Sequence, residues 1–340
     1  MPSGVAADDI YDRYDVALHC CLSLASHANQ LMHAMTPYQL KQSALRAMRG
    51  CASMITSDSL PTNIGYGLDE LAKATANLAK IIHHDDEEPI FLFATGWRTG
   101  STLMQRVLVT DPNLLLWGEP HGRMGIMNRL GDMVASFDQR IAPDDVVLKA
   151  KADMKLSGEW IANLYPRTSV IREALQSMVY EWLGRPAKEL GYKRWGMKEV
   201  RLGHEDAALL RWLFPKAKFV VITRNPHDSY RSAMQLGPLW ERWPDRLVND
   251  AYAYGRLWNR LALSWKDAAA DFPVRRYRLE DLTGAGVDFD DLASFCRLEL
   301  NPEAAIGKKV GAGRSDAKLS WVDGMLLRRA TAPGRSWLGY

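Results

Sequence analysis

The sequence has little cysteine and no long apolar run. It contains four cysteines in 340 residues, with Cys20 and Cys21 adjacent and Cys51 and Cys296 far apart. Four thiols cannot hold together a chain of this length, and no Cys-x-x-Cys spacing typical of a metal or redox site is present. We therefore expect reduced thiols and a cytoplasmic protein. The first residues lack the basic and apolar regions of an export signal, and the most strand-like apolar run, residues 90–95, is far too short to span a membrane.

A strong charge imbalance is also absent. The chain has 43 Lys and Arg against 40 Asp and Glu, and its 47% hydrophobic content is typical of globular proteins. The charge is nevertheless unevenly distributed, because residues 1–90 hold 6 basic and 11 acidic residues, whereas residues 91–340 hold 37 and 29. The basic stretches are short and lack interleaved aromatic pairs, so we expect a small anionic ligand and no nucleic acid.

The first part of the chain has helical periodicity. Apolar residues recur at spacings of three and four over residues 8–35, and two more helices are expected before residue 84. We interpret residues 1–86 as a helical appendage that could mediate homodimerisation. The cluster at residues 83–88 places two histidines before four carboxylates. Adjacent side chains on a helix diverge, so we interpret it as a polar helix end and expect no metal site.

The pattern changes to alternating strands and helices at residue 87. Strands are expected at residues 90–95, 114–117, 194–198, 217–223 and 274–279. Helices are expected at residues 101–110, 121–137, 157–163, 170–184, 204–213, 226–235 and 245–270. This alternation predicts an α/β domain over residues 87–340, with a mainly parallel central sheet flanked by helices. Ligands of such sheets bind at the carboxyl ends of the strands.

A glycine-containing turn joins the first strand to the first helix of this domain. It reads Arg98-Thr99-Gly100-Ser101-Thr102. The first amides of the helix and the positive end of its dipole can hold an anion, to which Arg98 adds a permanent charge. The alternative is a capped helix with Arg98 in solvent. The turn is not a Walker A loop, because the GxxxxGK[ST] lysine is missing, and this disfavours a magnesium-dependent kinase.

A second motif follows the strand at residues 217–223. Arg224 stands at the carboxyl end of this strand, and Ser232 lies two turns into the next helix. Together they could bind a second phosphate, the arginine through its charge and the serine as a hydroxyl donor. The alternative is an Asn-Pro helix start with surface arginines.

The two motifs, RTGST and RNPxDxxxS, together resemble those of sulfotransferases that use 3′-phosphoadenosine 5′-phosphosulfate (PAPS). The resemblance covers about residues 88–315 and includes a late segment, residues 275–282, similar to the family's YEDL. It implies a P-loop NTPase-like sulfotransferase fold, PAPS as co-substrate, 3′-phosphoadenosine 5′-phosphate (PAP) as product and no metal. The arginine at position 98, where cytosolic members carry lysine, resembles the residue found in the bacterial and Golgi-type branches of the family. The implied contacts are Arg98, Thr99, Gly100, Ser101 and Thr102 for the 5′-phosphosulfate, with Arg224 and Ser232 for the 3′-phosphate.

Sulfuryl transfer to a hydroxyl also needs a base, and the best candidate is Glu119. It follows a short strand, and apolar surroundings near Trp117 would raise its pKa into a useful range. It also matches the glutamate base of Golgi-type members. His121 is the rival, because cytosolic branches use histidine. We favour Glu119; the alternative for both residues is a loop end in which Glu119 only caps the next helix.

Lys198 is the candidate for stabilising the leaving group. It ends a predicted strand in a segment that resembles the family's WG-x-K-x-P, although Val200 replaces the proline. The alternative is a surface lysine. Beyond the predicted sheet, residues 307–315 form a glycine-rich basic segment similar to the loop that closes over the nucleotide in many members, which makes Lys309 and Arg314 candidate contacts. A surface loop without a ligand is the alternative there.

These features predict a metal-independent, PAPS-dependent sulfotransferase. The predicted acceptor is a hydroxyl on a small molecule, a glycan or a lipid. Two other functions remain open: a P-loop-like small-molecule kinase, which would turn over ATP with magnesium, and a catalytically inactive nucleotide-binding protein, which would bind PAP without transferring sulfate.

Overall fold

A five-stranded sheet forms the centre of the molecule. The computed structural model describes residues 84–120, 124–136, 170–235, 242–243, 246–284, 286–306 and 318–340, together with Leu45 and Arg49, which are helical. The strand order is β2-β3-β1-β4-β7, and every neighbouring pair is parallel. The strands are β1 (Ile90–Ala94), β2 (Leu114–Trp117), β3 (Arg194–Glu199), β4 (Lys218–Thr223) and β7 (Val274–Arg278). Each expected strand is confirmed to within two residues, and all five carboxyl ends lie along one edge.

β1 is central because it has no polar side chain to keep in water. All five of its residues are at most 2% exposed. Phe91 and Phe93 both approach the ring of Phe219 on β4, with centroids 5.5 and 6.1 Å apart. On the other side of β1, Gly196 of β3 pairs with Ile90 so closely that a Cβ would lie 1.8 Å from the Ile90 carbonyl oxygen. Only glycine fits there.

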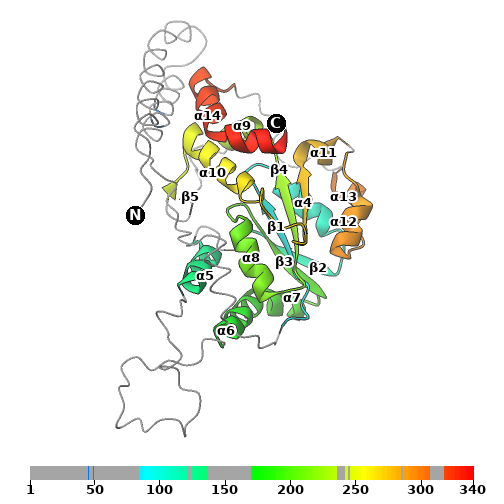
Figure 1. Cartoon of the computed structure of the whole chain (residues 1–340). Coiled ribbons are helices and arrows are strands. Elements are labelled where there is room, and N and C mark those ends of the chain that lie inside the picture. The colour runs from blue at the N-terminus through cyan, green and yellow to red at the C-terminus, as the bar shows by residue number, and fades with distance from the viewer. Residues whose placement is uncertain are drawn as a thin grey trace, which may run out of the picture.

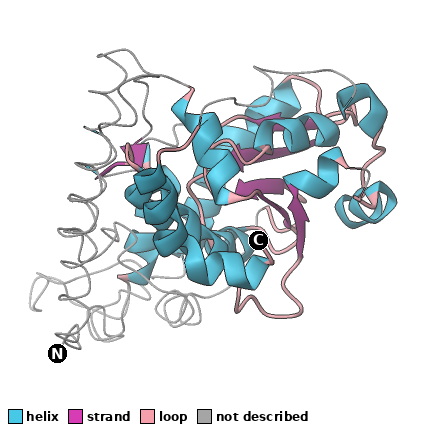
Figure 2. Cartoon of the chain, turned by 90° about the horizontal axis from the view of Figure 1, so that it is seen from above, coloured by secondary structure: helices cyan, strands magenta, loops and turns pink. Residues whose placement is uncertain are grey.

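Helices cover both faces of the sheet, as expected for parallel strands (Figures 1 and 2). One side carries α4 (Ser101–Leu108), α12 (Phe289–Cys296) and α13 (Pro302–Ile306). The other carries α6 (Val170–Val179), α8 (His204–Leu213) and α10 (Ala251–Leu263). The shorter α9 (Pro226–Met234) and α11 (Leu279–Thr283) begin directly at the carboxyl ends of β4 and β7. No helix in the described part of the chain is both long and apolar enough to cross a membrane.

Three expected helices differ from the structure. The helix expected at 170–184 is α6 followed by a π-helical turn, η5 (Tyr180–Gly184), and then α7 (Arg185–Glu189). The helix expected at 245–270 begins only at Ala251, because the Asp250 side chain accepts a hydrogen bond from the Ala253 amide and caps it. The helix expected at 121–137 is α5 (Ile126–Ala135), which begins after a left-handed glycine.

A short hairpin precedes α10. It pairs β5 (Arg242–Trp243) with β6 (Arg246–Leu247) and replaces the first turn of the long helix that the sequence predicts. The expected helix at 157–163 lies outside the described residues. So does the helical appendage, apart from Leu45, Arg49 and residues 84–86.

The C-terminal helix α14 (Trp321–Leu338) was not predicted. It packs along α10 through small residues: a Cβ at Gly255 would lie 2.7 Å from the Ala330 Cβ, and one at Gly334 would lie 2.9 Å from Trp258. This close contact brings the end of the helix back to the sheet. The Tyr340 hydroxyl lies 3.0 Å from the hydroxyl of Thr223, the last residue of β4.

The acidic cluster before β1, residues 84–88, contacts several helices and loops of the α/β domain. Residues 84–88 form a turn and an extended segment rather than a helix end. The His84 ring stacks on Tyr180 with centroids 3.9 Å apart. All four carboxylates have basic partners, namely Asp85 with Arg172, Asp86 with Lys216, Glu87 with Lys188 and Glu88 with Arg297. Within the described residues, no group of three or more His, Cys, Asp or Glu side chains is placed to hold a metal ion.

Candidate active site

The turn after β1 coils tightly at the start of α4. Gly96, Arg98 and Gly100 all have positive φ angles, of 119°, 64° and 92°. An arginine in this region is uncommon, and its conformation must be held by neighbours. One of these contacts lies inside the turn, where the Thr99 hydroxyl donates to the Gly96 carbonyl over 2.9 Å. Backbone of this shape can point its amides inward, which makes the helix start a candidate anion site.

Leu279, the first residue of α11, packs against this turn. A Cβ on Gly100 would lie only 2.4 Å from the Leu279 Cδ1 atom. The late segment that resembles YEDL therefore packs against the turn after β1. Only glycine satisfies both the left-handed angle at position 100 and this close contact.

The two predicted phosphate motifs meet in the structure. Arg98 Nε donates to the Ser232 hydroxyl over 3.0 Å, and Arg224 Nη1 donates to the Arg98 carbonyl over 2.9 Å. The contact arises because β1 and β4 are neighbours in the sheet, so the turns that follow them are adjacent. The second contact also explains how the unusual backbone of Arg98 is held.

A buried tyrosine anchors the same turn to α10. The Tyr254 hydroxyl donates to the Trp97 carbonyl over 2.7 Å, and Tyr254 is 1% exposed. Burial raises the pKa of Tyr254 well above its usual value, so the hydroxyl keeps its proton and remains a donor.

Glu119 lies two residues beyond β2 and contacts two cations. Lys198 Nζ donates to Glu119 Oε1 over 2.6 Å, and an Arg201 guanidinium nitrogen donates to Oε2 over 2.9 Å. The Glu119 side chain is 29% exposed, whereas that of Lys198 is 8% exposed. The surface-lysine interpretation of Lys198 is therefore wrong.

The expected pKa of Glu119 is also wrong in direction. Burial does raise the pKa, but Lys198 and Arg201 outweigh it, and the pKa of Glu119 lies below its usual value. The Trp117 indole donates to the Leu183 carbonyl of η5 over 2.8 Å. Glu119 is thus an ion-paired carboxylate.

Arg201 is the residue that the sequence reading missed. It is 2% exposed and bridges Glu119 and Glu199, whose Oε1 accepts a second guanidinium hydrogen bond over 2.7 Å. Its guanidinium carbon also lies 5.6 Å from the centroid of the Trp97 ring, which connects it to the turn after β1. Three charged residues stand close together in KEVR, residues 198–201, at the end of a buried strand, and this was the available signal.

Other predicted contacts are not all described. His121, Lys309 and Arg314 lie outside the described residues. Ser101 is buried and Thr102 is exposed at the first turn of α4. The site thus consists of an arginine–serine cluster beyond β1 and β4 and an ion-paired cluster beyond β2 and β3.

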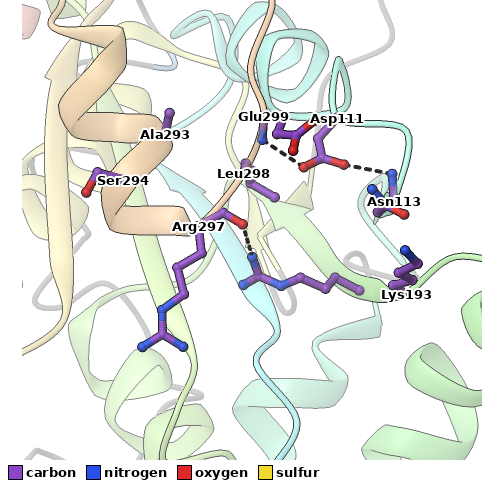
Figure 3. Close-up of a pocket in the computed structure, with 9 residues that line it drawn as sticks. Asp111, Asn113, Lys193, Ala293, Ser294, Arg297, Leu298 and Glu299 are labelled. Carbon is purple, nitrogen blue, oxygen red and sulfur yellow. Dashed lines mark hydrogen bonds between the residues drawn. The ribbon is translucent and has the colours of Figure 1, made fainter.

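A cavity of about 470 Å³ lies at the opposite edge of the sheet (Figure 3). It is lined by the amino-terminal ends of β2 and β3 and by α12, including Asp111, Lys193 and Arg297. Asp111 accepts hydrogen bonds from the Asn113 and Glu299 amides, as the dashed lines show. None of the predicted site residues lines this cavity.

Comparison with known proteins decides the family. Residues 89–290, more than half of the chain, match the profile of the sulfotransferase family. The chain belongs to the sulfotransferase family. Its α/β fold, with a strand, a glycine turn and a helix at the centre of a parallel sheet, is the P-loop-like fold that the sequence resemblance implies. No curated protein matches this sulfotransferase.

Several solved structures are distantly similar to this sulfotransferase. The sulfotransferase domain from the Synechococcus PCC 7002 olefin synthase is 18% identical, over 77% of this chain and 98% of that one, with a TM-score of 0.41. A sulfotransferase from Alicyclobacillus acidocaldarius is 14% identical, over 74% and 94%, with a TM-score of 0.40. Sulfotransferase STF1 from Mycobacterium tuberculosis H37Rv is 15% identical, over 96% and 93%, with a TM-score of 0.37.

Proposed function

We propose that this sulfotransferase transfers a sulfuryl group from PAPS to a hydroxyl of a small-molecule, glycan or lipid acceptor. The observation that carries the proposal is the contact between the two motifs, in which Arg98 donates to Ser232 and Arg224 donates to the Arg98 backbone. It gathers two permanent charges and a hydroxyl at the carboxyl edge of the sheet, where a ligand with two separate phosphate groups would need them.

The residues of the turn fit the 5′-phosphosulfate. The first amides of α4 have no partner within the helix and lie at the positive end of its dipole. Arg98 and Thr102 are exposed, so their side chains can reach a ligand. Thr99 is buried with its hydroxyl bonded to Gly96, and so we assign its contribution to the backbone. Arg224 and Ser232 are assigned to the 3′-phosphate.

Glu119 is proposed as the base. PAPS, when bound, supplies an activated sulfuryl group whose leaving group is a phosphate. Glu119 accepts the proton of the attacking hydroxyl, while Arg98 and Lys198 offset the negative charge that develops on the leaving phosphate. Lys198 donates to Glu119 in the structure, so this role requires it to exchange the carboxylate for the phosphate.

We also propose that turnover needs no metal ion. The charge that magnesium supplies in phosphoryl transfer would here come from Arg98 and Lys198. Activity in excess EDTA would then equal activity with magnesium.

Calorimetric titration with PAP in EDTA tests the donor site, with ATP and magnesium titrated alongside. We expect PAP to bind without metal and Arg224→Ala to weaken that binding. Arg275→Ala is the matched control, because Arg275 is an arginine at the far end of the next strand, ion-paired to Asp291. Binding of ATP with magnesium, without any binding of PAP, would favour the small-molecule kinase. PAP binding without any sulfate transfer would favour an inactive nucleotide-binding protein. Sulfate transfer that Glu119→Gln leaves unchanged would assign the base to another residue.

A further inference from the structure

Four charged side chains form a continuous row at the carboxyl ends of β2 and β3. Lys198 contacts Glu119, Glu119 contacts Arg201, and Arg201 contacts Glu199, over 2.6, 2.9 and 2.7 Å. The formal charges of the row sum to zero. The side chains of Lys198, Arg201 and Glu199 are at most 8% exposed, whereas that of Glu119 is 29% exposed.

The two cations in this row are held very differently. Arg201 is fixed on three sides, by Glu119, by Glu199 and by the face of Trp97. Glu199 is fixed in turn, because its Oε1 also accepts the Val200 amide over 2.7 Å. Lys198 instead brings a compact ammonium on a flexible stem, which can exchange one anion for another with little rearrangement.

The two oxygens of Glu119 therefore have different partners. Oε2 is held by the fixed arginine, and Oε1 by the flexible lysine. An incoming phosphate would compete with Oε1 for Lys198, whereas Oε2 would keep its guanidinium bond because Arg201 is held by other groups.

We propose that Arg201 is a positioning residue that holds Glu119 by Oε2 and so makes Oε1 the oxygen that takes the acceptor proton once the donor has drawn Lys198 away. This inference rests on the proposed function. In the transfer, the acceptor oxygen forms a bond to sulfur, and the bond from sulfur to the 5′-phosphate oxygen breaks. The electron pair of that bond leaves with PAP, and the hydroxyl proton goes to Oε1.

Lys198 and Arg201 have different effects on the ionisation of Glu119 during the proposed reaction. In the described residues, Glu119 faces Lys198 and Glu199 from β3 and Arg201 just beyond it. When Lys198 leaves, the pKa of Glu119 rises and the carboxylate becomes a better base. Without Arg201, burial and the charge of Glu199 would both favour the protonated form, which cannot accept a proton.

A purely structural role for Arg201 makes a different prediction. If it only neutralised Glu199, its removal would lower stability without a specific effect on the ionisation of Glu119. A probe of the Glu119 carboxyl group itself separates the two.

Carbon-13 NMR of protein labelled at the glutamate side-chain carboxyl provides this probe, with the Glu119 signal assigned from its loss in Glu119→Gln. We expect saturating PAP to raise the pKa of Glu119 in the wild type. Arg201→Gln removes a positive charge and raises the pKa of Glu119 with or without PAP, whereas Arg201→Lys keeps the charge and returns the pKa most of the way to the wild-type value. Glu199→Gln removes a negative charge and lowers the pKa of Glu119. Arg260→Gln removes a comparable part-buried pair with Glu205 elsewhere and leaves the Glu119 titration unchanged.

An unchanged Glu119 titration in Arg201→Gln would overturn the proposal, as would a titration that PAP does not move in a wild-type protein that binds PAP. If Arg201→Gln fails to fold, Glu199→Gln and Arg201→Lys still decide, because their expected effects differ. Failure of the wild type to bind PAP would instead reject the proposed donor, and the PAP-free comparison would still report whether Arg201 controls Glu119.

Discussion

Replacing Gly100 with alanine tests the turn at the centre of the candidate site. The φ angle of +92° is one that L side chains rarely adopt, and forcing one into the left-handed region costs about 1–2 kcal/mol. The new Cβ would also lie 2.4 Å from Leu279 Cδ1, whereas two carbons prefer about 3.5–4.0 Å. Leu279 is only half-buried and can swing aside, at a cost of about 1 kcal/mol in lost contacts. We therefore expect Gly100→Ala to destabilise the protein by about 2–3 kcal/mol.

Gly100→Ala should also weaken PAP binding, because it displaces the turn that is assigned to the 5′ end of the donor. Urea unfolding measures the loss of stability, and calorimetric titration measures the loss of PAP affinity. Adding Leu279→Ala to Gly100→Ala removes the overlap but not the backbone cost, so it should restore only part of the lost PAP affinity. Gly324→Ala is the control: it lies in α14 with nothing within 4 Å of a new Cβ, and we expect it to stabilise the helix by about 0.5–1 kcal/mol. The reasoning is refuted if Gly100→Ala unfolds at the wild-type urea concentration and binds PAP as tightly as the wild type.

Three further predictions concern binding, catalysis and assembly. Arg224→Ala should weaken PAP binding by about 1.5–3 kcal/mol, the range for a charge-assisted hydrogen bond, and unchanged affinity by calorimetry would remove the 3′-phosphate assignment. Glu119→Gln should lower turnover by about 10²–10⁴-fold without weakening PAP binding, because the carboxylate no longer competes with the phosphate for Lys198, whereas complete loss with His121→Ala alone would transfer the role of base to His121. Deletion of residues 1–83, which spares the contacts of Asp85, should change the oligomeric state in light scattering more than it changes PAP affinity.

The sheet could be predicted from the sequence because its signals are local. The apolar run of β1 ends in a glycine turn, and Asn225-Pro226 marks the start of α9, where the Asn225 side chain accepts the His227 amide. Once the strands are in place, their parallel order brings the turns after β1 and β4 together. The meeting of Arg98 and Ser232 follows from that order.

The ion-paired row could not be predicted, because it depends on a pairing between distant segments. Glu119 meets Lys198 and Arg201 only because β2 lies beside β3, about 80 residues later in the chain. From the sequence alone, the hydrophobic residues before Glu119 predicted a raised pKa for this carboxyl group. In the structure, its two cationic neighbours lower the pKa instead. α14 was missed for a different reason: Pro333 lies inside the helix, where local propensity argues against one, and packing on α10 outweighs it.

The position of β1 has a consequence for how the protein is made. This apolar strand emerges from the ribosome before either of its partners, and the first of them, β3, ends 105 residues after Ala94. At about 5–20 residues per second, β1 waits roughly 5–21 s for that partner. A short, uncharged segment of high β-propensity without proline is prone to aggregate while it is unpaired. The risk of aggregation arises during this interval, before the fold is complete. Soluble yield should therefore depend more on chaperone supply and on temperature than on the final stability of the fold.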